Sequence, residues 1–397
     1  MTSTSDQVLN RKKYIAGILE MGCQELELPQ TKREAAESAY NSVGGWLNDC
    51  PTMGPFRPVI FPQGSMALGT TVKPLNREEF DIDLICHLTL GDEQLPQARV
   101  KSAVGDRLNA HATYREMLEE FKRCWRLNYA EETQLHLDIT PAVKNSGCPN
   151  GGLCVTDKEA RAWQPSHPKG YIDRFNERAV LQPRFRERPF EQKDESISIK
   201  AKLEPFPEHT PFKGLLRRTV QIVKRHRCIY FEHRLKKAPI SIILTTLVAK
   251  AYEAVALSGS VYETEFDVVC DVISQMPDFI EQRRNNARLE FWIPNETTEG
   301  ENFAEKWNKD PELPKAFFEW HPIAVQHFTT LAEAVDAEGT FSIFESISGK
   351  KTSAAVRARA TNAVNHARVQ GLLRASPSGA LSLSTGVPVV TNTFFGA

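Results

Sequence analysis

Residues 80–85, with the sequence Phe-Asp-Ile-Asp-Leu-Ile, limit the fold of this chain more than any other segment. Successive side chains of a β-strand point to opposite faces, so the apolar residues would enter a core while Asp81 and Asp83 project together from the other face. Two neighbouring carboxylates repel each other unless a cation lies between them. The segment therefore predicts a strand in a sheet with one buried face, which carries a cation-binding pair of aspartates.

A second alternating segment, Leu-His-Leu-Asp-Ile at residues 135–139, places Asp138 on the polar face of another expected strand. If the two strands are neighbours, Asp138 joins Asp81 and Asp83. Mg²⁺ prefers carboxylate and phosphate oxygens. Three carboxylates can hold two such ions about 3.5–4 Å apart for an in-line phosphoryl displacement. The alternative is that all three are solvated strand carboxylates, because Asp-x-Asp pairs are common.

A glycine and a serine precede the first aspartate, in the segment Pro-Gln-Gly-Ser-Met-Ala-Leu-Gly-Thr at residues 62–70. Gly64 lets the backbone approach a ligand closely. Ser65 offers a hydroxyl and a backbone N–H at the start of an expected short helix, where an anion is favoured. We expect a triphosphate to lie there with its metal ions on the aspartates, although a plain turn would also fit.

The expected elements divide the chain into three parts. In the first part strands alternate with helices, which predicts a mixed sheet backed by helices. The expected helices are at 7–27, 30–49 and 97–125, and the strands at 59–61, 78–88 and 133–143. From about residue 211 the pattern is helical, with a last helix at 351–373. We therefore expect a catalytic core with N-terminal helices at 1–210, a helical lobe at 211–374, a flexible tail at 375–397, and a site in the cleft between the lobes.

The length, net charge and composition of the chain limit the kinds of molecule that it is expected to bind. The chain has 397 residues and a net charge of -1, from 49 Lys and Arg against 50 Asp and Glu. Proteins that grip duplex nucleic acid usually carry a clear basic excess, so we expect no nucleic-acid partner. No apolar run approaches the roughly 18–20 residues of a membrane helix. The N-terminus lacks a signal-peptide core, and the eight cysteines form no C-x-x-C pair, so we expect a cytoplasmic protein without a membrane partner.

Gly64-Ser65, Asp81-x-Asp83 and Asp138 together resemble the pattern of polymerase-β-like nucleotidyltransferases. The longer strings at residues 62–70, 80–84, 137–143, 163–171 and 301–307 look like bacterial cGAS/DncV-like nucleotidyltransferases, or CD-NTases. The resemblance covers most of residues 8–373 in the order of the family. It implies an α+β fold with two lobes, in which a mixed-sheet catalytic core with flanking helices is followed by a C-terminal helical lobe.

The resemblance also implies an activity. CD-NTases are cyclic oligonucleotide synthases that join ribonucleoside triphosphates into a cyclic di- or trinucleotide, with 3′–5′ or 2′–5′ linkages, and release pyrophosphate. The product is a second messenger of anti-phage defence (CBASS) that acts on a downstream effector protein. By resemblance we expect ATP among the substrates and two Mg²⁺ ions as cofactors, which Mn²⁺ could replace.

Further binding residues follow from the same resemblance. Lys224, in a basic helix expected at 213–233, and Ser241, at the start of the next apolar helix, would bind the triphosphate together with Ser65. Lysine is a mobile point charge suited to phosphate, and a helix start favours an anion. Gln63 would help to shape the pocket. The alternatives are a solvated lysine and a serine that only caps its helix.

The last residues, Thr-Phe-Phe-Gly-Ala at 393–397, place two aromatic side chains on the expected tail. By resemblance to family members that work with a ubiquitin-activating-like enzyme, Ala397 would be a site of conjugation, and an unimportant end is the alternative. Two other functions stay open for the whole chain. One is a template-independent nucleotidyltransferase that acts on an RNA end, and the other is a catalytically silent nucleotide-binding protein.

Overall fold

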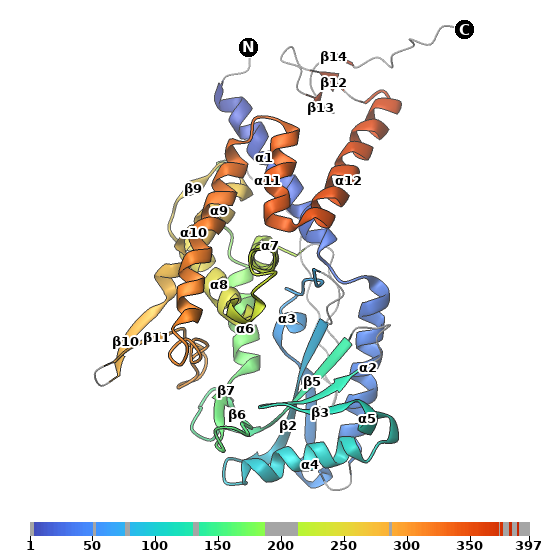
Figure 1. Ribbon diagram of the computed structural model, residues 1–397, viewed down its shortest axis with the longest axis vertical. Coiled ribbons are helices and arrows are strands. Elements are labelled where there is room, and N and C mark those ends of the chain that lie inside the picture. Colours follow the sequence, from blue (N-terminus) through green and yellow to red (C-terminus); the bar gives the residue numbers. More distant parts are fainter. Residues whose placement is uncertain are drawn as a thin grey trace.

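Two lobes, one built on a sheet and one on helices, make up the computed structural model of the protein (Figure 1). The structure describes residues 4–50, 53–75, 80–129, 135–186, 213–285 and 288–372, with the short pieces 374–375, 381–382 and 387–388. The expected domain boundary at 210/211 lies outside these residues, as do most of the expected tail and Ala397. The predicted α+β architecture with a mixed sheet and a helical lobe is confirmed.

The sheet lobe contains a seven-stranded mixed sheet. Its strands follow the order β1-β2-β5-β4-β3, and β6 and β7 extend it from β5. The two central strands, β2 and β5, run parallel, and β1 and β4 flank them in the antiparallel sense. The strands are β1 (Pro58–Pro62), β2 (Phe80–Asp92), β3 (Leu118–Glu120), β4 (Trp125–Asn128), β5 (Leu135–Lys144), β6 (Leu153–Val155) and β7 (Gln164–Ser166).

One face of this sheet is buried under helices. Ile82 and Leu84 of β2 and Leu137 of β5 pack in one cluster with Val43 and Val104 from the helices α2 and α4. The helices of this lobe are α2 (Gln30–Asn48), α3 (Gly64–Ala67), α4 (Gln97–Asn109), α5 (Ala112–Met117) and the 3-10 helix η1 (Gly54–Phe56). Because the apolar side chains alternate with the aspartates, the carboxylates emerge on the opposite face.

In the helical lobe, helix α8 (Ser241–Leu257) is apolar on most sides, and its residues 243–252 are all buried. Some of the other helices pack directly against it, and the rest pack on those helices or on one another. The helices of this lobe are α1 (Thr4–Glu25), α6 (Pro168–Ala179), α7 (Leu215–Tyr230), α8 (Ser241–Leu257), α9 (Glu265–Gln275), α10 (Glu312–Glu333), α11 (Ala337–Ser348) and α12 (Lys350–Val369), with η2 (Leu235–Lys237) and η3 (Met276–Phe279). Of the helices described, none combines the length and the apolar character that crossing a bilayer requires.

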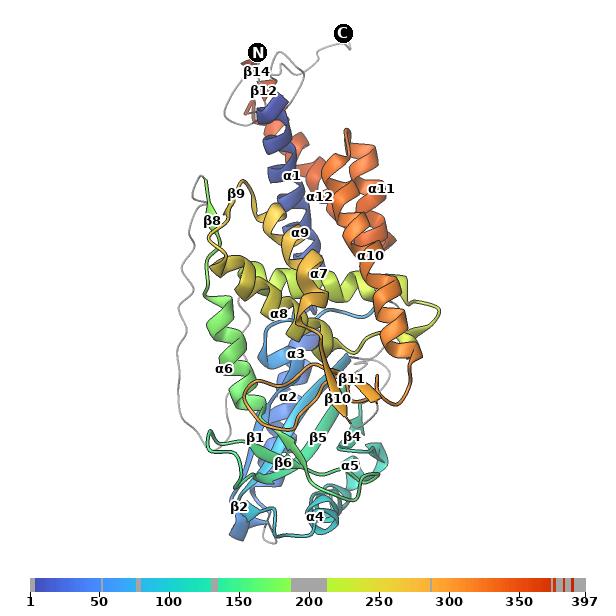
Figure 2. The same ribbon diagram turned by 90° about the vertical axis from the view of Figure 1, so that its left-hand side faces the viewer.

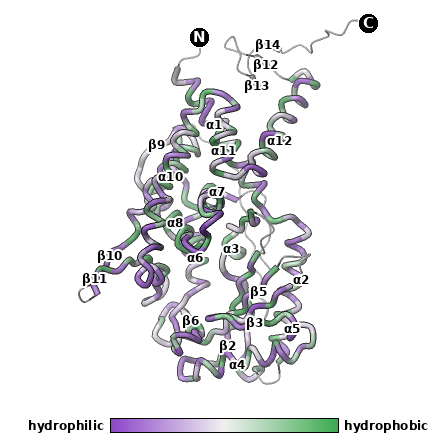
Figure 3. The backbone as a smooth tube through the Cα atoms, viewed as in Figure 1, coloured by the Kyte–Doolittle hydropathy of each residue, from purple (hydrophilic) through white to green (hydrophobic). Residues whose placement is uncertain are grey.

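Short strands complete the helical lobe. A hairpin of β10 (Glu281–Asn285) and β11 (Arg288–Trp292) projects from the lobe and is largely hydrophilic (Figures 1 and 3). The remaining strands have two residues each and are β8 (Arg184–Phe185), β9 (Val261–Tyr262), β12 (Arg374–Ala375), β13 (Leu381–Ser382) and β14 (Val387–Pro388).

Helix α1 (Thr4–Glu25) packs in the helical lobe, although the expected division of the chain placed it with the catalytic core. Ile15 and Ile18 are fully buried in the same cluster as the apolar residues of α7 and α8. Lys12 of α1 pairs with Asp267 of α9 at 2.5 Å. Figure 2 shows α1 running alongside α9 and α12. The apolar stripe of α1 thus fits the helical lobe, whereas α2 fits the sheet.

The prediction of helical structure at residues 97–125 holds as far as Met117 and is wrong beyond it. The chain forms α4 and α5 and then turns into the hairpin β3–β4, whose second strand pairs antiparallel with β5. Pairing with a central strand outweighs the helical preference of the Leu-Glu-Glu-Phe-Lys sequence at residues 118–122.

Candidate active site

Three aspartates meet on the open face of the sheet. Strands β2 and β5 are direct neighbours, and in their register Asp83 lies opposite Asp138 while Asp81 lies opposite His136. The structure therefore brings together the three carboxylates that the alternating patterns singled out, and their role in catalysis stays a prediction.

An arginine that the sequence did not single out lies among these carboxylates. In Arg126 of β4, Nε is 2.6 Å and Nη2 is 2.8 Å from the two carboxylate oxygens of Asp138. The same Nη2 lies 3.1 Å from Oδ1 of Asp81. Nδ1 of His136 lies 3.3 Å from that oxygen and 3.1 Å from Nη1 of Arg126. The hydrogen bonds from Arg126 to Asp138 raise the pKa of the guanidinium, so it stays charged.

The carboxylates together carry more negative charge than their surroundings neutralise. Burial, together with the nearby charges of Asp138 and Asp81, raises the pKa of Asp83 to about 7 against the opposing effect of Arg126 and Lys224. The pKa of Asp81 is also raised, first by the burial of part of its side chain, even though half of that side chain remains exposed. Such a cluster is stabilised by additional cations.

The three aspartates fit divalent cations chemically, but Arg126 lies against two of them. Among the residues that the structure describes, no three His, Cys, Asp or Glu side chains are arranged as they would be around a metal ion. Carboxylate oxygens are nevertheless the ligands that Mg²⁺ prefers, and a cation would offset the burial and the repulsion that raise the pKa of Asp83. Asp81, Asp83 and Asp138 would hold metal ions once the Arg126 guanidinium moves aside.

The glycine of the Gly-Ser segment lies directly against Asp83. Gly64 has a φ of +64°, and a Cβ at this position would be 2.4 Å from Oδ2 of Asp83. The backbone N–H of Gln63 donates to the carbonyl of Asp83 at 2.8 Å. Ser65 follows in α3, and its hydroxyl accepts from Oγ1 of Thr71 at 3.4 Å. The backbone hydrogen bond of Gln63 thus holds the Gly-Ser segment beside Asp83, and only glycine fits at position 64.

Lys224 reaches this segment from the other lobe. It lies on α7, is almost fully buried, and donates from Nζ to the carbonyl and the hydroxyl of Thr70 at 3.2 and 3.1 Å. Burial, together with the nearby positive charge of Arg227, lowers its pKa to about 7, while the charge of Asp83 acts in the opposite direction. The predicted phosphate-binding lysine therefore contacts Thr70, at the end of the Gly-Ser segment, and interacts electrostatically with Asp83.

Ser241 is linked to α7, the helix that carries Lys224, by a hydrogen bond from Arg227. It is the first residue of α8, and it is exposed. Its hydroxyl accepts a hydrogen bond from Nη2 of Arg227 at 3.0 Å. Arg227 lies on α7 three residues after Lys224, so both side chains project from neighbouring turns of one helix. Nothing in the sequence distinguishes Arg227 from the other basic residues of α7.

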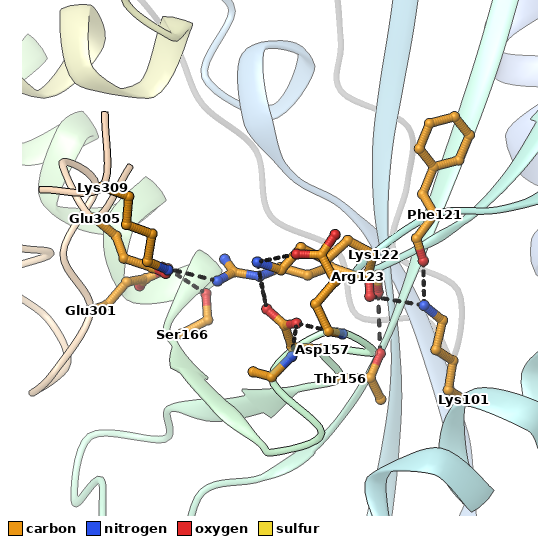
Figure 4. A network of polar contacts seen from close by, with 12 residues as sticks. Lys101, Phe121, Lys122, Arg123, Thr156, Asp157, Ser166, Glu301, Glu305 and Lys309 are labelled. Atoms are coloured by element: carbon orange, nitrogen blue, oxygen red, sulfur yellow. Dashed lines mark hydrogen bonds and ion pairs between the residues drawn. The ribbon is translucent and has the colours of Figure 1, made fainter. Parts of the chain in front are cut away.

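The hairpin that carries Arg126 is anchored to the helical lobe (Figure 4). In the turn between β3 and β4, Arg123 bonds through Nε to Asp157 at 3.0 Å and through Nη2 to Glu305 at 3.4 Å. Ser166 of β7 donates to Glu301 at 3.1 Å. Glu301 and Glu305 both precede α10, so the bonds of Arg123 to Glu305 and of Ser166 to Glu301 join the two lobes.

Known proteins share both the fold and the sequence pattern of this chain. Residues 17–179 match the family model of the Second Messenger Oligonucleotide or Dinucleotide Synthetase domain. The c-di-GMP synthase of Roseivirga ehrenbergii is 32% identical over 404 residues, which cover 98% of each chain.

Among solved structures, the CD-NTase CdnG of Bradyrhizobium diazoefficiens in complex with GTP has a TM-score of 0.64 at 18% identity, over 88% of this chain and 98% of that one. CdnC of Escherichia coli MS115-1 with ATP has a TM-score of 0.60 at 14% identity, over 84% and 97%. Escherichia coli DncV bound to 3′-deoxy GTP has a TM-score of 0.57 at 15% identity, over 83% and 93%.

These likenesses agree with one another in fold and over nearly the whole length of the chain. The solved structures are too distant in sequence to show more than the two-lobed polymerase-β-like fold, and the curated relative supplies the family. The resemblance that the sequence motifs suggested is therefore confirmed, and the chain belongs to the bacterial cGAS/DncV-like nucleotidyltransferases, a family of nucleotide-joining enzymes.

Proposed function

We propose that the protein is a cyclic dinucleotide synthase that uses GTP and joins two nucleotides in one site. The observation that carries the proposal is the placement of Asp81, Asp83 and Asp138 on adjacent strands, beside Gly64 and within the electrostatic reach of Lys224. The name of the 32%-identical relative, a c-di-GMP synthase, and the GTP bound to CdnG support guanine as a base. ATP remains a second candidate substrate, supported by the ATP bound to CdnC.

The triphosphate of the donor nucleotide binds where the two lobes meet. Ser65 donates its hydroxyl from the sheet lobe, while Lys224 and Ser241 approach from the helical lobe. An anion beside Lys224 raises the pKa of its ammonium again, because the charged form gains a partner. Gln63 takes part through its backbone, which holds the Gly-Ser segment against Asp83. These contacts fix the α-phosphate next to the carboxylates.

Mg²⁺, or Mn²⁺ in its place, would be held by Asp81, Asp83 and Asp138, and when bound it stabilises phosphate charge and lowers the pKa of the acceptor hydroxyl. Asp138 orients the ribose hydroxyl and accepts its proton. The hydroxyl oxygen forms a bond to the α-phosphorus, the bond to the β-phosphate oxygen breaks, and pyrophosphate leaves. A second attack by the other ribose, with release of a second pyrophosphate, closes the ring.

A cyclic dinucleotide suits a diffusible signal, since it has no free phosphate end. We propose that the product is a second messenger of anti-phage defence that activates a separate effector protein. Membership of the family supports this role.

The first test is product analysis. The purified protein is incubated with all four ribonucleoside triphosphates and Mg²⁺ or Mn²⁺, treated with phosphatase, and its products are identified by mass spectrometry. We expect a phosphatase-resistant cyclic dinucleotide that contains guanine, and none from the Asp81→Asn/Asp83→Asn double variant, whose fold is checked by circular dichroism. Extended linear products would instead indicate an enzyme that adds nucleotides to an RNA end. Nucleotide binding without turnover would favour a silent binding protein.

A further inference from the structure

We propose that Arg227 is a further binding residue of the triphosphate site and that it contacts the terminal phosphates together with Ser241. The inference rests on the proposed function and adds to it a contact that the sequence motifs do not contain. Its starting point is the hydrogen bond from Nη2 of Arg227 to the Ser241 hydroxyl, at 3.0 Å. This bond joins α7 to the first turn of α8.

Arg227 differs from the nearby arginines Arg218 and Arg234 in its ion-pair partners. Arg218 on the same helix pairs with Glu20 and Glu27, and Arg234 beyond the helix pairs with Glu319. In the part of the chain that the structure describes, no carboxylate forms an ion pair with Arg227, and its buried Nε has no hydrogen-bond partner. A guanidinium with a buried, unused donor is energetically costly unless an anion binds it.

A second cation lies close to Arg227. Lys224 lies about one helical turn before Arg227 on α7, and its pKa is lowered by burial and by the positive charge of Arg227. Among the residues that have a described position, Lys224 bonds only to uncharged oxygens of Thr70. Two cations that face the same junction without a carboxylate bonded to either form a site that an anion of multiple charge would stabilise.

The donor geometry fits phosphate. The guanidinium presents several N–H groups in a planar fork that matches two phosphate oxygens. Because the Ser241 oxygen accepts from Arg227, the hydroxyl hydrogen points elsewhere and is free to donate to a ligand. Ile240, at the N-cap of the 17-residue helix α8, supplies no side-chain cap, so the first N–H groups of α8 add further donors. The ligand class is therefore the polyphosphate end of a nucleoside triphosphate.

The test compares ligands that differ only in phosphate number. The full-length protein is titrated by calorimetry, in Mg²⁺, with the α,β-imido analogue of GTP, with GDP and with GMP. The variants are Arg227→Ala, Arg227→Lys and the control Arg234→Ala, which removes an exposed arginine already paired with Glu319. We expect Arg227→Ala to weaken the triphosphate analogue at least tenfold, GDP less, and GMP within twofold. Arg227→Lys should recover part of the loss, and Arg234→Ala should match the wild type.

Steady-state kinetics give a second readout. Loss of a contact to the terminal phosphates should raise KM for GTP by a larger factor than it lowers kcat. Inorganic tripolyphosphate should raise the Tm of the wild type and raise that of Arg227→Ala by less than half as much, which keeps the inference testable if the nucleotide affinities are weak.

Different failures have different meanings. If the wild type binds the analogue and Arg227→Ala binds it within twofold, or if GMP binding falls as much as triphosphate binding, the inference on Arg227 is wrong and the proposed function stands. If the wild type binds no nucleoside triphosphate with Mg²⁺, the proposed function itself is wrong and the inference falls with it.

Discussion

The carboxylate of Asp83 occupies the space that a side chain at Gly64 would need. With a φ of +64° and a would-be Cβ 2.4 Å from Asp83, a side chain here would both strain the backbone and displace a proposed metal ligand. We expect Gly64→Ala to reduce cyclic nucleotide synthesis by about 100-fold, since a shift of about 1 Å in a catalytic group can have that effect.

The matched control for this variant is Gly45→Ala. Gly45 lies in α2 with nothing within 4 Å of its would-be Cβ, so alanine should leave activity unchanged and stabilise the helix by up to about 1 kcal/mol. Turnover by Gly64→Ala within threefold of the wild type would show that Asp83 does not need its present position.

Arg126 competes for the carboxylates that would hold metal. In Arg126→Gln the charge that bridges Asp138 and Asp81 is lost, so the metal-free protein should unfold at a lower temperature. Mn²⁺, however, should bind more tightly without nucleotide, by about tenfold or more, because no internal cation has to be displaced. Mn²⁺ binding is followed by electron paramagnetic resonance of the free ion. Equal or weaker binding in the variant would mean that Arg126 assists the metal site instead of competing with it.

At the scale of elements, the strands that carry the aspartates were predictable and the strand that carries Arg126 was not. The patterns around Asp81 and Asp138 alternate over several residues, and a strand is their direct consequence. The segment before Arg126 has good helix formers and a short apolar pattern, and its conformation is decided by pairing with β5. Arg126 lies opposite Asp138 only because β4 pairs in that register, and a single sequence does not contain this information.

Helices α7 and α10 are joined by a buried chain of rings that makes the helical lobe sensitive to acid. Nε1 of Trp320 donates to Nδ1 of His226 at 2.9 Å, and Nε2 of His226 is 3.0 Å from Nδ1 of His327. Burial lowers the pKa of His226 to about 3 and also lowers that of His327. Between pH 6.5 and 3 these histidines therefore bind more protons in the unfolded chain than in the folded chain. The free energy of unfolding falls as the pH falls.

This linkage gives a prediction for His226→Gln, whose amide can accept from Trp320 and donate to His327 but does not titrate. Its free energy of unfolding should depend less on pH between 6.5 and 4 than that of the wild type, by up to about 1.4 kcal/mol per pH unit. Urea unfolding at pH 4.5, 5.5 and 7.5 measures the slope, with the exposed His233→Gln as control. Parallel slopes in wild type and His226→Gln would contradict the assignment.

At the scale of the molecule, the proposed nucleotide site is shared by the two lobes. Ser65 lies in the sheet lobe, Lys224 and Ser241 lie in the helical lobe, and Lys224 already contacts Thr70 across the junction. Binding of the α,β-imido analogue of GTP should therefore slow amide hydrogen exchange in residues 64–71 and also around the start of α8. The exposed hairpin β10–β11 serves as an internal control and should not change. Protection in one lobe alone would place the nucleotide outside this junction.

The two-lobed architecture followed from the change of sequence pattern near residue 211, but the position of α1 did not. The sequence of an amphipathic helix shows that one side is apolar, but it does not show which partner covers that side. Ile15 and Ile18 could have packed on the sheet as well as on α7 and α8, and only the folded chain decides between them.

The position of α1 has a consequence for the order in which the protein can assemble during synthesis. Its buried side faces α7, α9 and α12, which leave the ribosome long after it. At a synthesis rate of about 5–20 residues per second, α12 is completed on the order of tens of seconds after α1. During this time the apolar side of α1 is uncovered, while the sheet lobe can already fold. A chain interrupted before α7 would carry the three aspartates without Lys224, Arg227 and Ser241. An incomplete chain would therefore lack the proposed substrate-binding groups of the helical lobe and should produce no signal.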